Sequence, residues 1–313
     1  MAGIWVYSED DVITKQLLTV GKEIAAKMQE PLCALTLEEG MAKSLISSGA
    51  EKVFVLCGAS IWPESYAQAI AKFAVEQKPS ALFIGATLRG KDLAAKVAAI
   101  LKTGLATDAF AVRYSEGSIE TDRMMYGGLA VCTEILSTPS LVTIPPRTFE
   151  EPLADDSRSG EIIKISVSHE TGVSVSAVCP IVRKGADITA AETVVCVGRG
   201  LAKQEDLQIA QELAAVLHGE VGCTRSIAED YHWLPAETYI GLSGQKVKPS
   251  LYLSMGVSGQ IQHVSGIRDS KVIVAIDTNE NAPIFEAADY GIVGSLYEVV
   301  PLLTKEIQKL KQG

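Results

Sequence analysis

The amino-acid sequence predicts an α/β protein with two domains, and three observations lead to that prediction. Short apolar runs alternate with longer segments of helical periodicity in both halves of the chain. The runs lack polar alternation, which is typical of parallel strands that are buried on both faces. The length of 313 residues is sufficient for two hydrophobic cores. We expect one domain over 1–185 and a second over 186–313.

The first domain is expected to have three layers, with a mostly parallel sheet plus β-hairpins. Apolar runs predict strands at Ile4–Tyr7, Leu32–Leu37, Val53–Cys57 and Ala81–Ala86, and helical periodicity predicts helices at Val12–Gln29, Met41–Ser48, Tyr66–Glu76 and Lys91–Lys102. From Phe110 the period changes to two residues, and Glu-Gly and Gly-Gly pairs indicate hairpin turns. Leu141–Ile144 and Ile162–Val167 continue as strands.

A polar stretch over 183–192 is expected to link the two domains. After it, strands are predicted at Val194–Val197, Glu220–Cys223, Tyr239–Gly241, Leu251–Met255, Val272–Ile276 and Tyr290–Val293, with helices at Gln204–Leu217 and Leu296–Leu310. His218 and Gly219 are expected to end the first of these helices. This alternation predicts a compact, doubly wound, Rossmann-like unit of the type that binds nucleotides.

Composition excludes several classes of function. The net charge of −10 argues against nucleic-acid binding, which needs a basic face. No apolar run has the length of a membrane span, so we expect no direct membrane insertion, and the amino-terminal residues do not predict a signal peptide. The six cysteines and four histidines are dispersed, so we expect no metal site and reduced core thiols in a cytoplasmic protein.

The segment LYLSMGVSGQIQHVSGI, residues 251–267, is the most informative stretch. A buried strand, a glycine turn and a helix over Gln260–Ile267 capped by Ser258 are expected. Such an arrangement receives phosphate, because glycine lets backbone N–H groups approach an anion and the helix dipole favours negative charge. The candidate ligand contacts here are Gly256, Ser258, Gly259, Gln262 and His263.

Further candidates follow other predicted strands of the second domain: Arg199, Thr224 with Arg225, Ser243 with Gly244, and Asp277. Ligands of such sheets bind beyond the carboxyl ends of the strands, so we expect these residues to surround one large phosphorylated ligand. Asp289 has two possible roles. It either caps a helix end, which is a structural role, or its carboxylate binds a ribose or adenine group of the ligand.

Two roles are possible for His263, one structural and one in contact with a ligand. A single histidine near a helix start is more often a structural donor than a catalyst. It follows the phosphate-type turn, however, and no acid or nucleophile is spaced to form a triad with it. This argues against hydrolysis and for contact with a cofactor. Arg199 and Arg225 add positive charge, which would stabilise a reduced, anionic cofactor.

The second domain resembles the FAD-binding domain of the electron transfer flavoprotein alpha subunit. The matching residues are VVCVGRGL (194–201), GCTRS (222–226), LYLSMGVSGQIQHVSGIRDSKVIVAI (251–276) and APIFEAADYGIVG (282–294). In the first domain, ALFIGATLRGKDLAAKVAAILKTGLATD (81–108) and MYGGLAV (125–131) are also similar to the family. The resemblance covers essentially the whole chain.

The resemblance implies a heterodimer with a beta subunit and one FAD in the second domain. By position, Arg225 resembles the arginine over the isoalloxazine, Ser243 the hydroxyl beside flavin N5, and His263 the histidine at the pyrimidine-ring carbonyl. Ser258 and Gly259 resemble the pyrophosphate contacts, Gln262 a ribityl-side contact and Asp289 an adenosine contact. Charge and donors near flavin N1 and O2 would tune its potential.

Three departures from the family pattern are visible. Gly241-Leu242-Ser243-Gly244-Gln245 stands where the family commonly has Gly-Gln-Thr-Gly-Lys, so the hydroxyl is kept while the amide and the ammonium are lost. Asp277 stands where an asparagine is common, and a carboxylate would repel phosphate but can bind ribose hydroxyls. Gly127-Gly128 replaces an alanine-glycine pair.

We therefore expect an electron carrier rather than a stand-alone enzyme. Its FAD would accept electrons from an acyl-CoA dehydrogenase-type flavin enzyme, or from a beta-subunit flavin, and pass them to another redox protein. One alternative is a subunit of an electron-bifurcating, NADH-dependent complex. Another, from a different class, is an adenine-nucleotide-binding regulatory module. A separate NAD-dependent dehydrogenase has least support, since no Gly-x-Gly-x-x-Gly occupies a first strand-to-helix turn.

Overall fold

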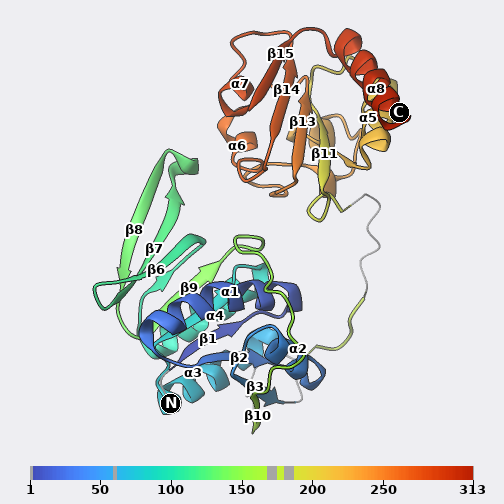
Figure 1. Cartoon of the computed structure of the whole chain (residues 1–313). Helices are drawn as coiled ribbons and strands as arrows, with labels where there is room; N and C mark the ends of the chain where they lie inside the picture. Colours follow the sequence, from blue (N-terminus) through green and yellow to red (C-terminus); the bar gives the residue numbers. More distant parts are fainter. Residues whose placement is uncertain (1–2, 59–61, 168–174, 180–186, 313) are drawn as a thin grey trace. The chain divides into compact units, whose positions relative to one another are not determined.

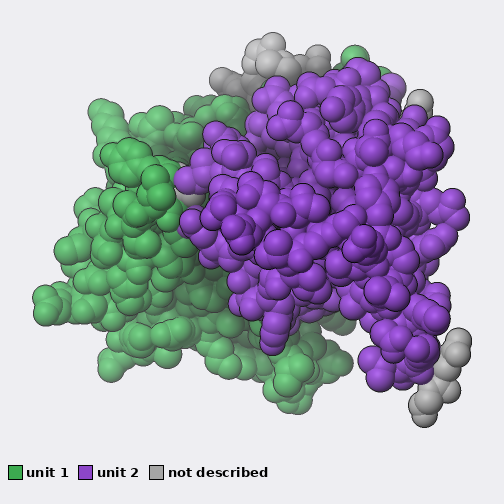
Figure 2. Space-filling view, turned by 90° about the horizontal axis from the view of Figure 1, so that it is seen from above, with its two compact units in different colours: residues 1–178 green, residues 179–313 purple. Residues whose placement is uncertain are grey.

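The computed structural model describes residues 3–58, 62–167, 175–179 and 187–312. The chain forms two compact units, Met1–Val178 and Cys179–Gly313, which are coloured separately in Figure 2. The predicted domain boundary at 185/186, and part of the predicted linker, fall outside the described residues. Within the described residues, no helix is both long and apolar enough to cross a membrane.

The first unit is built on a seven-stranded parallel sheet (Figure 1). Its order is β10-β3-β2-β1-β4-β9-β5. The strands are β1 (Ile4–Tyr7), β2 (Leu32–Thr36), β3 (Lys52–Cys57), β4 (Ala81–Gly85), β5 (Leu105–Ala106), β9 (Ser140–Ile144) and β10 (Glu161–Ser166). The central strands are buried on both faces, which explains their uninterrupted apolar sequences.

Four helices cover the two faces of this sheet: α1 (Asp11–Met28), α2 (Ala42–Ser47), α3 (Ala67–Gln77) and α4 (Leu88–Leu101). Alternate residues of each strand point to opposite faces. Ile4 and Val6 therefore pack with α1 and α2, whereas Trp5 and Tyr7 pack with α3 and α4. The predicted three-layer arrangement is confirmed.

A separate antiparallel sheet extends from the first unit (Figure 1). It comprises β6 (Ala109–Ser115), β7 (Ser118–Met125) and β8 (Ala130–Leu136), in the order β6-β7-β8. One face packs on the domain through Ile119 and Thr121, both buried. The predicted hairpins are therefore confirmed.

The second unit has a five-stranded parallel sheet in the order β12-β11-β13-β14-β15. Its strands are β11 (Thr193–Val197), β12 (Glu220–Cys223), β13 (Leu251–Met255), β14 (Ile273–Asp277) and β15 (Tyr290–Val293). Helices α5 (Leu207–Leu217) and α8 (Leu296–Gln312) pack on one face, and α6 (Ile261–Val264) and α7 (Ile284–Ala287) lie on the other (Figure 1). If the strands are numbered along the chain from β11, their order across the sheet is 2-1-3-4-5. The direction of winding therefore reverses between β11 and β13. Ligands bind at such a switch point.

Two local predictions for the second unit were wrong. Tyr239–Gly241 is not a strand, because Tyr239 and Ile240 form only isolated bridges, to Cys223 and Gln245. The expected helix over Gln260–Ile267 is shorter: α6 begins at Ile261, and Gln260 is its N-cap. Ser258 does not cap it, since no side chain of the described residues forms a cap hydrogen bond to α6; the Ser258 carbonyl instead accepts a hydrogen bond from the Ile284 N–H at 3.1 Å.

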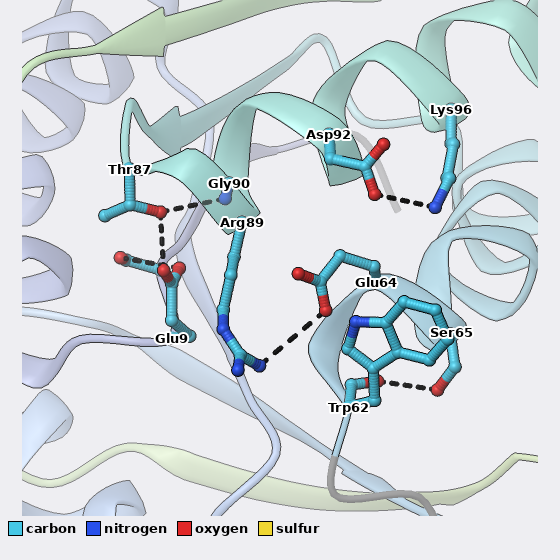
Figure 3. A network of polar contacts seen from close by, with 10 residues as sticks. Glu9, Trp62, Glu64, Ser65, Thr87, Arg89, Gly90, Asp92 and Lys96 are labelled. Atoms are coloured by element: carbon cyan, nitrogen blue, oxygen red, sulfur yellow. Dashed lines mark hydrogen bonds and ion pairs between the residues drawn. The ribbon is translucent and has the colours of Figure 1, made fainter. Parts of the chain in front are cut away.

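The first unit has its own switch point, between β1 and β4, and a polar network occupies it (Figure 3). Thr87 caps α4 by accepting a hydrogen bond from the Gly90 N–H, and its hydroxyl donates to the Glu9 carboxylate at 2.5 Å. The negative charge of Glu9 therefore lies near the positive end of α4. Beside it, Arg89 forms an ion pair with Glu64 at 3.7 Å.

Candidate functional site

The second unit contains a cavity of about 660 Å³ at the carboxyl edge of its sheet. Residues after all five strands line it, as expected for a doubly wound fold. Its volume lies within the range of small-molecule and cofactor sites. Ten of the twelve candidate residues are in its wall: Arg199, Thr224, Arg225, Ser243, Gly256, Ser258, Gly259, Gln262, His263 and Asp277.

Two glycine turns meet in the cavity wall. Gly200, after β11, lies so close to Gly256, after β13, that a Cβ on Gly200 would be 2.5 Å from the Gly256 Cα. The Gly200 N–H donates to the Gly256 carbonyl at 3.0 Å. Gly256 also has a φ of +65°, which favours glycine. The two turns therefore leave the backbone at the switch point bare of side chains, so that a ligand can approach it.

The Ser258-Gly259 turn is fixed against α7. Gly259 has a φ of +77°, and a Cβ there would lie 2.4 Å from backbone atoms of Ile284. Ser258 is exposed and Gly259 is buried. A residue with a side chain would separate this turn from α7, so the glycine sets the shape of this part of the wall.

Thr224 has an unsatisfied polar group. Its hydroxyl oxygen is buried and has no hydrogen-bond partner among the described residues. A buried hydroxyl without a partner is costly, and a bound polar ligand would remove that cost. Thr224 lines the cavity, so its hydroxyl fits a phosphate or hydroxyl group of a ligand.

The charges of the cavity wall come from two arginines and one aspartate. Arg225 is exposed, and its guanidinium Nε donates to Glu229 at 2.5 Å, which raises the pKa of Arg225 further. Arg199 is also exposed. Asp277 ends β14, and its carboxylate accepts from the Asn279 N–H at 2.9 Å. The site can therefore compensate the negative charge of a phosphorylated ligand at one part and bind hydroxyls at another.

Ser243 lines the cavity, whereas Gly244 does not. The Ser243 hydroxyl is hydrogen bonded to the Tyr239 hydroxyl at 2.8 Å. Gly244 packs against the same tyrosine, because a Cβ on Gly244 would meet the Tyr239 carbonyl oxygen at 2.5 Å. Gly244 thus shapes the turn that presents Ser243.

Asp289 lies apart from the cavity. It precedes β15, and its carboxylate accepts from the Ile273 N–H at the start of β14, at 2.8 Å. Both positions are at the amino edge of the parallel sheet, opposite the cavity. The structure therefore does not bring Asp289 together with the other candidates.

Sequence reasoning missed lining residues that follow β15, above all Ser295 and Tyr297. The Tyr297 hydroxyl accepts from the Ala202 N–H at 2.8 Å and donates to Asp206 at 2.6 Å. It thereby ties the start of α8 to the loop after β11. The signal was available, because Gly294-Ser295 follows a predicted strand in the same way as the other candidate turns.

His263 is buried in the cavity wall, at 8% exposure. Its Nδ1 lies 3.1 Å from the Ile240 carbonyl oxygen, and its Nε2 lies 2.7 Å from the Tyr252 hydroxyl. Burial lowers the pKa of His263 to about 4, against which the hydrogen bond to Ile240 acts weakly. The ring is therefore neutral at physiological pH.

This pKa predicts a pH dependence of stability. The unfolded chain takes up a proton on His263 near pH 6.5, whereas the folded chain does so near pH 4, so the free energy of unfolding falls as the pH falls through this window. We expect a loss of roughly 2 kcal/mol between pH 7 and pH 5. Urea unfolding of wild type and His263→Gln would test this. Exposed His218→Asn should keep the wild-type slope, and an equal slope in His263→Gln would contradict the assignment.

The fold and the cavity together indicate which class of ligand-binding domain the second unit belongs to. A doubly wound sheet with ligand loops after every strand, bare glycine backbone at the switch point and arginines in the wall is typical of a domain that binds a nucleotide cofactor. No cluster of histidine, cysteine or carboxylate side chains suited to a metal ion is present in the described part of the chain.

Comparison with known proteins identifies the family. Residues 4–170 match the electron transfer flavoprotein domain, and residues 187–268 match the electron transfer flavoprotein FAD-binding domain. The chain is 38% identical to YdiR of Escherichia coli K12, whose name places it among electron transfer flavoprotein subunits, over 98% of both chains. It is 34% identical to the electron transfer flavoprotein subunit alpha of Thermoanaerobacterium thermosaccharolyticum, over 98% of both chains. It is 33% identical to protein FixB of Salmonella typhimurium, over 98% of this chain and 99% of that one.

The chain belongs to the electron transfer flavoprotein alpha-subunit family, a family involved in electron transfer, and its cofactor is FAD. The predicted family, fold class and cofactor are thereby confirmed. The orphaned Thr224 hydroxyl and the bare glycine backbone are suited to a phosphate group of such a cofactor.

Proposed function

We propose that this chain is the alpha subunit of a heterodimeric electron transfer flavoprotein in the cytoplasm. Its FAD accepts electrons from an acyl-CoA dehydrogenase-type flavin enzyme, or from a flavin of the beta subunit, and another redox protein receives them. The observation that carries the proposal is the cavity of about 660 Å³ in the second unit, which all five strand ends line with glycine, hydroxyl and arginine groups.

Individual residues take the following roles in the proposal. The Ser258-Gly259 turn, with Thr224, holds the pyrophosphate, and Asp277 accepts from ribose hydroxyls. Arg225 and Ser243 lie at the isoalloxazine, and Gln262 is on the ribityl side. FAD, when bound, supplies the electron-accepting chemistry. The protein binds it, orients its ring and sets the charge around it.

Colour and nucleotide content test the proposal. Purified chain, co-expressed with its beta subunit, should be yellow and release one FAD per alpha subunit on denaturation. A colourless complex that releases ADP or AMP instead would favour the adenine-nucleotide-binding regulatory module. Electron transfer should be measured with an acyl-CoA dehydrogenase as donor, and absence of reduction by any such donor would remove that partner from the proposal.

The electron-bifurcating alternative is separated by counting flavins in the same complex. One FAD with AMP indicates a simple carrier, whereas two FAD, together with reduction by NADH, indicate a bifurcating complex.

The first unit supplies a surface that fits a permanent partner. On its antiparallel sheet and the turn between β7 and β8, five apolar side chains are exposed close together in sequence, namely Met124, Tyr126, Leu129, Val131 and Ile135. Tyr126 and Leu129, at the β7–β8 turn, are each 77% exposed. Apolar contact faces of this kind are characteristic of obligate subunit interfaces. We assign this apolar hairpin face to the beta subunit.

Arg225→Ala is expected to lower the reduction potential of the bound flavin. Loss of about 1–2 kcal/mol of charge stabilisation corresponds to roughly 20–40 mV for a two-electron couple. A spectroscopic redox titration measures this shift. Arg225→Lys, which keeps the charge, should retain more of the potential than alanine does. An unchanged potential in Arg225→Ala would place the guanidinium away from the flavin ring.

A further inference from the structure

A buried hydrogen-bond network holds the His263 ring from two directions. Tyr252 on β13 is fully buried, and its hydroxyl lies 2.7 Å from Nε2 of His263. The Ile240 carbonyl oxygen lies 3.1 Å from Nδ1. Cys196 on β11, also fully buried, has its Sγ at 3.9 Å from Nε2. Both ring nitrogens are thus engaged by the protein itself.

The chemistry of these partners fixes the position of the proton. A carbonyl oxygen can only accept, so Nδ1 must carry the hydrogen that points at Ile240. The opposite tautomer would set the Nδ1 lone pair against the carbonyl lone pairs. In the neutral ring, Nε2 is then bare and can only accept, and the Tyr252 hydroxyl is the donor at hydrogen-bond distance.

We propose that Tyr252 is a positioning residue, which holds His263 as the Nδ1–H tautomer with Nε2 facing the tyrosine hydroxyl. In this arrangement the neutral ring has no N–H left to donate to a ligand in the cavity. This differs from the expectation that His263 donates a hydrogen bond to a flavin carbonyl. Such a donation requires an additional proton on Nε2 or a turned ring.

The Cys196 thiol is a second neighbour in the same network, with its Sγ 3.9 Å from Nε2 of His263. If Nε2 takes up a proton from solvent, the imidazolium can donate to the Tyr252 oxygen while the tyrosine O–H turns to the Cys196 sulfur. Tyr252 therefore accommodates both protonation states of His263 without a change in the backbone, and its removal should alter how the site responds to charge on a bound cofactor.

Nitrogen-15 NMR of histidine-labelled chain, in its complex with the beta subunit, tests the tautomer. His263→Gln identifies the His263 signals among those of the four histidines. We expect a protonated Nδ1 and an unprotonated Nε2 in wild type, and a displaced Nε2 signal in Tyr252→Phe. Cys196→Ala is the comparison variant, because it removes the thiol beside Nε2 and keeps the hydroxyl donor, so the Nε2 signal should move less than it does in Tyr252→Phe and Nδ1 should stay protonated. A protonated Nε2 at neutral pH in wild type would overturn the proposal.

The consequence for the cofactor rests on the proposed function and is measured separately. Tyr252→Phe should keep one FAD per alpha subunit but change the ratio of affinities for reduced and oxidised flavin several-fold, where tenfold is about 30 mV for a two-electron couple. An unchanged potential together with unchanged nitrogen signals would show that Tyr252 only fills space. If FAD is absent altogether, the proposed function fails while the NMR result still decides the tautomer.

Discussion

Gly200→Ala is expected to lose most of the FAD from the purified protein. A Cβ at this position would lie 2.5 Å from the Gly256 Cα and 3.1 Å from its carbonyl oxygen, and both are backbone atoms that cannot move without shifting the turn after β13. Overpacking of this kind costs about 1–3 kcal/mol, which corresponds to an affinity lowered roughly 5-fold to 150-fold. Because Gly200 and Gly256 both line the cavity, the displacement falls where the ligand approaches.

Flavin content after gel filtration, and FAD affinity by fluorescence quenching, measure this loss. Gly40→Ala is the matched control, since a Cβ at Gly40 would meet nothing within 4 Å. Circular dichroism must show that Gly200→Ala remains folded. Full flavin content in folded Gly200→Ala would mean that the two turns can separate without cost, and the cavity would then not be shaped by their contact.

Ile135→Glu is expected to prevent stable association with the beta subunit. Ile135 is 71% exposed on β8 within the apolar hairpin face. A carboxylate buried there without a partner would cost several kcal/mol in the complex and almost nothing in the free chain. The dissociation constant should rise more than about 100-fold, and the beta subunit should be lost on affinity purification of the tagged alpha chain.

Val75→Glu on α3 is the control for this prediction. Val75 is an exposed apolar side chain of the same unit, at 60% exposure, but it lies outside the apolar hairpin face. It should leave the complex intact. If both variants keep the beta subunit, the partner binds elsewhere on the chain, and if both lose it, the effect comes from general surface charge.

The order and type of most elements followed from the sequence, because buried parallel strands show as short apolar runs. Glu220–Cys223, Leu251–Met255 and Tyr290–Val293 have the predicted bounds. The prediction of a strand at Tyr239–Gly241 was wrong, because a three-residue run of this kind does not distinguish a strand from a segment that makes only single bridges. The predicted Ser258 cap was wrong because the helix begins later than its periodicity indicates, at Ile261, with Gln260 in the N-cap position.

The candidate site was predictable where a residue follows a strand. Arg199 and Thr224 follow strands, Asp277 is the last residue of β14, and all three line the cavity. Asp289 precedes a strand instead, and in a parallel sheet this places it at the other edge. The partners of His263 could not be predicted, because Tyr252 and Ile240 come from separate segments and only the folded backbone brings them to its two nitrogens.

The hydrogen bond between Glu9 and Thr87 limits how many dinucleotides one alpha chain can bind. In the first unit, a dinucleotide phosphate would bind at the switch point between β1 and β4. The carboxylate of Glu9 lies at this position, hydrogen bonded to Thr87. That internal anion would repel a second one, so we expect each alpha chain to saturate at a single dinucleotide. A heterodimer that contains two flavins must then hold the additional one in its beta subunit, and titration of isolated alpha chain with excess FAD should reach one equivalent and stop.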